Sequence, residues 1–226
     1  MPIDLIIFDC DGVLVDSEVI SCRAHADVLS QHGYPITSEQ VLERFLGRSM
    51  RQATREVEAE LGRSLPDDFH SQVYAEIFQA FATSLEATPY IGEALTQIAV
   101  PTCVASSGPP EKISASLNRV GLYDRFAPNI FSAVQVPNGK PAPDLFLFAA
   151  KRMQTEPARC LVIEDSVAGI AGARAAGMPV LGFHGGSHCG TGHADTLLRA
   201  GAGLTFDDMR QLPDLIRRAD AAVLAD

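Results

Sequence analysis

The sequence has little positive charge, and this shortage limits its partners. Its 226 residues include 18 lysines and arginines against 28 aspartates and glutamates, which gives a formal net charge of −10 at pH 7. No basic stripe is available to contact the phosphates of a nucleic acid or an anionic membrane surface. We therefore expect neither nucleic acid nor a membrane as a partner. The net charge does not exclude a small anionic substrate, because a local cluster of hydrogen-bond donors can outweigh a distant net charge.

Long apolar runs and a disulfide framework are also missing. No apolar run approaches the length that a membrane span needs, and the first residues lack a basic region followed by an apolar stretch. We therefore expect no membrane span and no signal peptide. The five cysteines are odd in number and widely spaced, which favours reduced thiols in a cytoplasmic protein.

The most informative stretch is a short apolar run that ends in two carboxylates. Asp9 and Asp11 follow the run, and residues two apart on a strand point the same way. Gly12 then permits a sharp turn. Two carboxylates this close would repel each other. The pattern therefore predicts a bound cation, a shared proton, or both.

The chain divides into a helical segment and an alternating segment. Residues 17–84 place apolar side chains at helical spacing in four successive runs, with no convincing strand. Residues 1–16 and 85–226 alternate strands with helices, which predicts an α/β core with a doubly wound parallel sheet. The helical segment is then a domain inserted after the first strand. The predicted strands cover residues 4–9, 101–106, 129–133, 160–164 and 179–183.

Polar side chains follow four of the predicted strands, where an open α/β sheet binds its ligand. Each set alone has an ordinary explanation as a cap, a turn or a solvated charge. Their convergence at one sheet edge favours a site with carboxylates for Mg²⁺, hydroxyls and amides for phosphate, and one ammonium. This is the set that phosphoryl transfer requires. The four sets are Asp9 and Asp11; Ser106, Ser107 and Gly108; Lys140; and Glu164 and Asp165.

Four motifs in order make the chain resemble a known family. They are DCDGVLVDS at residues 9–17, the serine at 106, GKPAPD at residues 139–144, and EDSVAG at residues 164–169. The sequence resembles the haloacid dehalogenase-like hydrolases, in the β-phosphoglucomutase-like subgroup with a helical cap. The resemblance covers essentially the whole chain.

The resemblance implies a role for each motif residue. Asp9 would be the nucleophile that forms an aspartyl-phosphate, and Asp11 would protonate the leaving group and then activate water. Ser106 and Lys140 would hold the transferring phosphoryl group. Mg²⁺ would be bound by Asp9, Asp165 and the backbone carbonyl of Asp11, with Glu164 in or next to the ligand set. Residues 17–84 would form the mobile cap.

Single residues distinguish hydrolysis from the other reactions that the resembled family catalyses. Dehalogenases of the family lack the second aspartate of the first motif, so Asp11 argues against that reaction. Phosphonatases use a cap lysine, but the three lysines here, Lys112, Lys140 and Lys151, all lie outside the cap. β-Phosphoglucomutases carry a cap histidine at the position of Ser21 and a cap lysine, and both are absent. Simple hydrolysis is therefore favoured over a mutase-type phosphotransferase. A non-catalytic phosphate-binding regulatory module would be expected to lose Asp9 or Asp11, and both are present.

The expected substrate is a small phosphorylated metabolite. The cap entry DSEVI and the stretch VPTCVASSGP resemble bacterial 6-phosphogluconate phosphatase-like proteins, which suggests a sugar phosphate or a phospho-sugar acid such as 6-phosphogluconate. Arg48 and Arg51 in the cap are candidate substrate-binding residues, with solvated helix-surface arginines as the alternative. We expect a monomer or a weak homodimer.

One irregular loop, residues 184–193, is rich in histidine and glycine. Its His184, His188, Cys189 and His193 raise the possibility of a zinc site. The spacing matches no established ligand pattern, so an ordinary exposed loop is the favoured interpretation.

Overall fold

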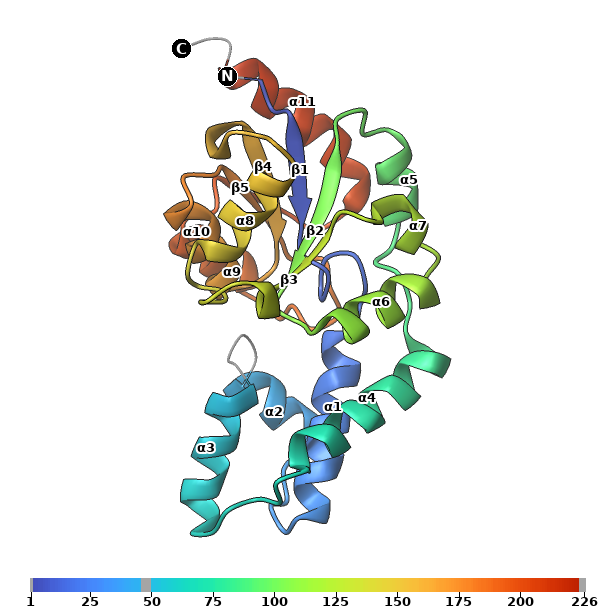
Figure 1. The fold of residues 1–226 in the computed structure, drawn as a ribbon, viewed down its shortest axis with the longest axis vertical. Helices are drawn as coiled ribbons and strands as arrows, with labels where there is room; N and C mark the ends of the chain where they lie inside the picture. The colour runs from blue at the N-terminus through green and yellow to red at the C-terminus, as the bar shows by residue number, and fades with distance from the viewer. Residues whose placement is uncertain (1, 46–49, 224–226) are drawn as a thin grey trace. The chain divides into compact units, whose positions relative to one another are not determined.

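The computed structural model describes residues 2–45 and 50–223, and the chain divides into two compact units (Figure 1). The α/β unit comprises Met1–Asp16 and Glu86–Asp226, and the helical unit comprises Ser17–Leu85. The border falls within one residue of the domain limits expected from the sequence. Among the described residues, no helix combines the length and apolar character that a membrane crossing requires.

The α/β unit is organised around a six-stranded parallel sheet with strand order β3-β2-β1-β4-β5-β6. The first strand is therefore central, as expected for a continuous apolar run that is buried on both faces. The predicted fold class, a doubly wound parallel α/β sheet, is confirmed. The strands are β1 (Leu5–Phe8), β2 (Thr102–Ser106), β3 (Ile130–Ser132), β4 (Cys160–Glu164), β5 (Val180–Phe183) and β6 (Leu204–Phe206).

Helices cover both faces of this sheet (Figure 1). Leu5 and Ile7 of β1 belong to one apolar cluster with residues of α8, α9 and α10. Phe8, which alternates to the other face, makes an edge-to-face contact with Phe126 of α7, with ring centroids 5.9 Å apart. The helices are α5 (Ile91–Thr96), α6 (Pro110–Arg119), α7 (Tyr123–Phe126), α8 (Asp144–Arg152), α9 (Val167–Ala175), α10 (His193–Ala200) and α11 (Leu212–Val223).

In its described residues, the helical unit has four helices with an apolar interior. Buried side chains recur on one face of its longest helix at Phe69, Val73, Ile77 and Phe81. This spacing of four residues matches the turn of an α-helix and explains why the sequence folds as a helix there. The helices are α1 (Glu18–Gln31), α2 (Ser38–Phe45), α3 (Met50–Leu61) and α4 (Phe69–Ser84).

Candidate active site

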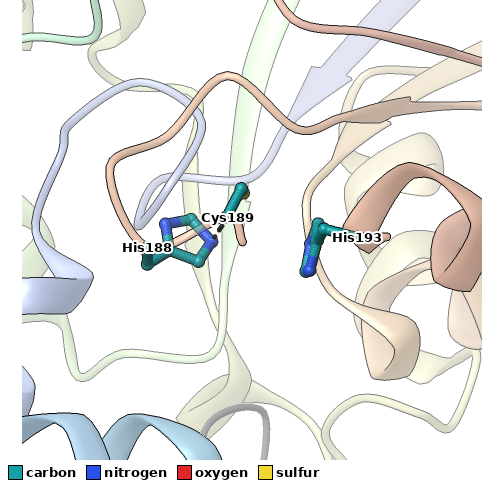
Figure 2. Close-up of side chains that lie close together, drawn as sticks. All are labelled: His188, Cys189 and His193. Carbon is teal, nitrogen blue, oxygen red and sulfur yellow. Dashed lines mark hydrogen bonds between the residues drawn. The ribbon is translucent and has the colours of Figure 1, made fainter. Parts of the chain in front are cut away.

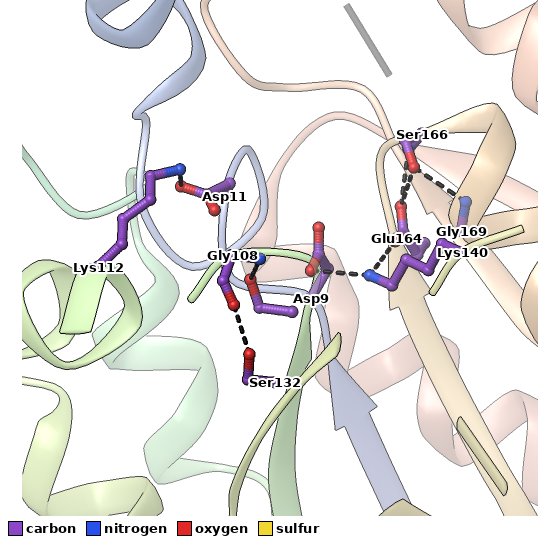
Figure 3. Close-up of polar contacts among 10 residues, drawn as sticks. Asp9, Asp11, Gly108, Lys112, Ser132, Lys140, Glu164, Ser166 and Gly169 are labelled. Atoms are coloured by element: carbon purple, nitrogen blue, oxygen red, sulfur yellow. Dashed lines mark hydrogen bonds and ion pairs between the residues drawn. The ribbon is translucent and has the colours of Figure 1, made fainter. Parts of the chain in front are cut away.

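The carboxyl ends of three adjacent strands bring the predicted residues together. β1 pairs with β2 on one side and with β4 on the other, and Phe8 is in register with both Val104 and Ile163. Asp9, which follows β1, therefore lies between the ends of its two neighbours. Ser106 ends β2 and Glu164 ends β4. Parallel pairing thus gathers residues that are up to 155 positions apart at one edge of the sheet (Figure 3).

Lys140 lies between two of these carboxylates. Its Nζ is 2.8 Å from Asp9 Oδ1 and 2.6 Å from Glu164 Oε1, and its side chain is only 3% exposed. Burial alone would lower the pKa of Lys140, but the two carboxylates outweigh it and raise that pKa. The ammonium therefore stays charged and fixes the position of the Asp9 carboxylate.

The surroundings of Asp9 disfavour the ionised form of its carboxyl group. Burial raises the pKa of Asp9 to about 7, the attraction of Lys140 opposes this rise, and the nearby charge of Glu164 adds to it. One ammonium therefore does not fully offset burial and the neighbouring acid. A further positive charge at this position would restore the ionised carboxylate.

Glu164 is fully buried, and hydrogen-bond donors surround its carboxylate. Lys140 contacts Oε1, while the backbone N–H and the hydroxyl of Ser166 donate to Oε2 at 2.8 and 2.9 Å. Ser166 in turn caps α9 by accepting from the N–H of Gly169 at 3.0 Å. A Cβ at Gly169 would lie 1.8 Å from Glu164 Oε1, so glycine is required there. This geometry suits a residue that holds Lys140, and the role of Glu164 as a direct metal ligand stays a prediction.

Asp11 pairs with a lysine that sequence reasoning did not place in the site. Lys112 Nζ is 2.7 Å from Asp11 Oδ1, across 101 positions of the chain. Lys112 lies in the first turn of α6, directly after the predicted phosphate-binding stretch, and it is largely buried. Its position in the helix that begins at the end of β2 is the signal that could have identified it.

The turn after β2 has the predicted hydroxyl and amide groups. Ser106 is buried, and its Oγ accepts a hydrogen bond from the N–H of Gly108 at 3.1 Å. This bond leaves the hydroxyl proton of Ser106 directed elsewhere, where a phosphoryl oxygen could accept it. The carbonyl of Gly108 accepts from Ser132 at 2.6 Å, which fixes the turn from the neighbouring strand. Ser107 lies between the two and is exposed.

Three carboxylates form a candidate metal site. Asp9, Glu164 and Asp165 are buried, and each offers an oxygen within 4.8 Å of the others. Lys140 contacts two of the three carboxylates, and burial, with a smaller contribution from the charge of Glu164, raises the pKa of Asp9. Hard carboxylate oxygens in a buried acidic cluster fit Mg²⁺, which takes only a few protein ligands and keeps several waters. The side chain of Asp11 is not part of this cluster, so its predicted share in metal binding would come from its backbone carbonyl.

The cap arginines are not connected to this site by any observation. Arg51 lies in the first turn of α3 and is exposed. Arg48 lies outside the described residues. Their predicted substrate contacts, like the cap role of the helical unit, stay predictions.

Comparison with known proteins shows the family. The model of the haloacid dehalogenase-like hydrolases matches residues 3–177, which include every motif identified above. The chain therefore belongs to the haloacid dehalogenase-like hydrolases. The predicted resemblance is confirmed.

Individual relatives cover nearly the whole chain. A 6-phosphogluconate phosphatase of Escherichia coli is 35% identical over 214 residues, which are 94% of each chain. A phosphorylated carbohydrates phosphatase of Thermotoga maritima is 32% identical over 180 residues, 77% of this chain and 82% of that one. The crystal structure of a haloacid dehalogenase-like protein of unknown function from Agrobacterium tumefaciens is 38% identical, with a TM-score of 0.85 over 99% of this chain and all of that one. The expected enzyme class, a phosphoric monoester hydrolase, is confirmed.

Proposed function

We propose that this enzyme is a Mg²⁺-dependent phosphatase that hydrolyses a small phosphorylated sugar or a phospho-sugar acid such as 6-phosphogluconate. The observation that carries the proposal is the placement of the Asp9 carboxylate, which Lys140 orients at 2.8 Å in a buried acidic cluster. The names of the two phosphatase relatives support the substrate class.

The first half of the reaction transfers the phosphoryl group to Asp9. An oxygen of Asp9 attacks phosphorus and forms a new P–O bond, while the bond from phosphorus to the sugar oxygen breaks. Asp11 gives its proton to that leaving oxygen. Lys140 holds the attacking carboxylate, and the Ser106 hydroxyl donates to a phosphoryl oxygen.

The second half returns the enzyme to its starting state. Asp11, now ionised, takes a proton from a water molecule, whose oxygen attacks phosphorus. The bond between phosphorus and Asp9 breaks, inorganic phosphate leaves, and Asp11 is protonated again. Lys112, 2.7 Å from Asp11, holds this carboxylate in one position through both halves.

Asp9 and Asp165 would hold the Mg²⁺ ion, with the backbone carbonyl of Asp11 as a further oxygen ligand. When bound, the ion supplies positive charge that favours the ionised form of Asp9 and stabilises the charge of the transferring group. Glu164 would act on the same site through Lys140, whose ammonium it contacts at 2.6 Å.

The proposal is tested by phosphate release from a panel of phosphosugars and phospho-sugar acids. We expect turnover of 6-phosphogluconate or a related compound with Mg²⁺, loss of turnover with EDTA, and recovery when Mg²⁺ is restored. The panel includes β-glucose 1-phosphate, whose conversion into glucose 6-phosphate without phosphate release would indicate a mutase. Absence of turnover across the panel would exclude the phosphatase and favour a non-catalytic phosphate-binding module.

A further inference from the structure

The loop between β5 and α10 was expected to be an ordinary exposed loop, but the structure buries part of it against the candidate active site. The side chain of His188 is 1% exposed, and its Nε2 is 2.9 Å from Asp165 Oδ2. Ser187 anchors the loop beside it by donating its N–H and its hydroxyl to Asp16 Oδ1, at 3.1 and 2.8 Å. His188 is therefore fixed next to a proposed metal ligand. Figure 2 shows its ring together with Cys189 and His193.

Two glycines make room for the His188 ring. A Cβ at Gly186 would lie 2.7 Å from ring atoms of His188. A Cβ at Gly12 would lie 2.9 Å from the same ring and 2.0 Å from Asp165 Oδ2, and the backbone φ of Gly12 is +76°. Since real Cβ atoms do not approach so closely, both positions require glycine. The ring thus packs between the turn that carries Asp11 and its own loop, in contact with Asp165.

A second histidine holds the backbone of the same aspartate. His193, the first residue of α10, has its Nε2 2.7 Å from the carbonyl oxygen of Asp165. Because a carbonyl oxygen can only accept, this Nε2 carries the proton. The same reasoning makes Nε2 of His188 the donor to an ionised Asp165 carboxylate. Both imidazoles therefore donate to one residue, at its side chain and at its main chain.

The loop has two candidate roles, which are binding a transition metal and holding Asp165, and the contacts distinguish between them. His188, Cys189 and His193 each offer a metal-ligating atom within 4.8 Å of the others, and Cys189 Sγ is 3.3 Å from His188 Nε2. A metal bound at either Nε2 would need a lone pair on that atom, so the hydrogen bond from that histidine to Asp165 would have to break. The observed contacts therefore favour a role toward Asp165.

We propose that His188 and His193 are positioning residues that hold Asp165 in the orientation in which its carboxylate binds the divalent metal ion. The proposal rests on the proposed function, because it takes Asp165 as a metal ligand. Ligating carboxylates are themselves oriented by hydrogen bonds, and loss of such a partner typically weakens metal binding about 10- to 100-fold. We expect an effect of that size for each histidine.

The test is direct binding of Mn²⁺, used as a spectroscopic substitute for Mg²⁺, to the full-length protein without substrate. Electron paramagnetic resonance measures the free ion for the wild type, His188→Leu, His188→Gln, His193→Leu and the matched control Cys189→Ser. Leucine removes the donor, whereas the glutamine amide can replace Nε2–H. We expect the dissociation constant to rise about 10- to 100-fold for both leucine variants and to stay within about threefold of wild type for the other two.

Steady-state kinetics on the proposed phosphatase reaction provide a second readout. In the leucine variants the Mg²⁺ concentration for half-maximal activity should rise by the same factor, while the substrate KM at saturating Mg²⁺ stays unchanged. A merely structural defect would instead lower the amount of active protein without moving the Mg²⁺ requirement. If His188→Leu does not fold, His193→Leu carries the same test from a less buried position.

The possible failures can be told apart. Wild-type Mn²⁺ affinity in both leucine variants would overturn the positioning role and leave the proposed function intact. If the wild type itself binds no divalent ion, the metal-dependent function fails, and the positioning role fails with it. Stoichiometric Co²⁺ binding with a thiolate charge-transfer band that Cys189→Ser abolishes would show that the loop is a metal site, and would also overturn the proposal.

Discussion

The two units of this protein differ in what they bury. Among the described residues, the buried polar and charged side chains lie in the α/β unit, except for Ser17 at the start of the helical unit. The interior of the helical unit is built from apolar side chains such as Val57, Val73 and Phe81. Burying charge is costly unless the charges are paired. In the α/β unit, buried charged side chains gather at one sheet edge, and this is where we place the reaction.

This comparison predicts that charge-removing substitutions have their largest effects in the α/β unit. Asp9→Asn removes the attacking oxygen's charge and should reduce kcat on the order of 10⁴-fold or more, with the fold retained. Circular dichroism and a kinetic assay on the same preparation measure both. The matched control is Asp124→Asn, an exposed aspartate of the same unit, which should keep wild-type activity. Equal activity of the two variants would remove Asp9 as nucleophile.

Lys140→Met should have the next largest effect, on stability as well as on activity. It leaves the carboxylates of Asp9 and Glu164 buried without their shared ammonium, and breaking a buried pair in this way costs about 3–5 kcal/mol. Urea unfolding measures the loss. Lys151→Met, an exposed lysine at the end of α8, serves as control and should change stability by less than about 0.5 kcal/mol. A similar small change at Lys140 would contradict the described pairing.

Lys112→Met tests the pair that the sequence did not reveal. Without the ammonium 2.7 Å away, the Asp11 carboxylate loses its fixed position. We expect kcat to fall about 10- to 100-fold, less than the roughly 10²- to 10⁴-fold that general acid–base catalysis contributes, because Asp11 itself is still present. The substrate KM should change less than kcat. Lys112→Arg, which can restore the charge, should recover part of the activity. Full activity in Lys112→Met would show that this contact does not serve the reaction.

In the helical unit we expect a pH effect on stability instead of an effect on chemistry. Burial lowers the pKa of His25 to about 4, and nearby His70 contributes to this shift. The unfolded chain, with a histidine pKa near 6.5, then binds more protons than the folded one between about pH 4 and 6.5, so stability falls as pH falls through that window. From pH 7 to pH 5 the loss should be roughly 2 kcal/mol.

Urea unfolding at these two pH values, followed by a probe in residues 17–85, measures this loss. His25→Phe keeps a ring beside Phe45 and Phe69 but cannot be protonated, so it should remove this part of the pH dependence. An unchanged pH dependence in His25→Phe would show that another group causes it.

Local patterns predicted most of the fold, because the elements that matter are long or strongly apolar. The central strand, the four helices of the helical unit and the motif residues at the strand ends all follow from periodicity and from the α/β rule. Three helices or strands were missed, and one of them, α7, is a helix of only four residues. The strand β6 has only three residues and is recognisable only through its pairing with β5, and α10 begins inside a glycine-rich loop that reads as irregular.

The missed parts of the site share one physical reason. Lys112 follows the predicted phosphate-binding stretch and His188 lies in a histidine-rich loop, but neither position shows the distant residue that the side chain contacts. Lys112 meets Asp11 across 101 positions, and His188 meets Asp165 because two glycines leave space for its ring. Such contacts depend on how distant segments pack in three dimensions, and no local pattern in the sequence predicts that packing.

The most direct test of the whole account is the chemical fate of Asp9 during turnover. Borohydride reduces an aspartyl-phosphate to homoserine, so quenching the enzyme with borohydride during hydrolysis of a phosphosugar marks the attacked carboxylate. We predict homoserine at position 9 in the digested protein when both substrate and Mg²⁺ are present, and unmodified aspartate when either is omitted. Steady release of phosphate with Asp9 unmodified under all conditions, or modification at another carboxylate, would contradict the account.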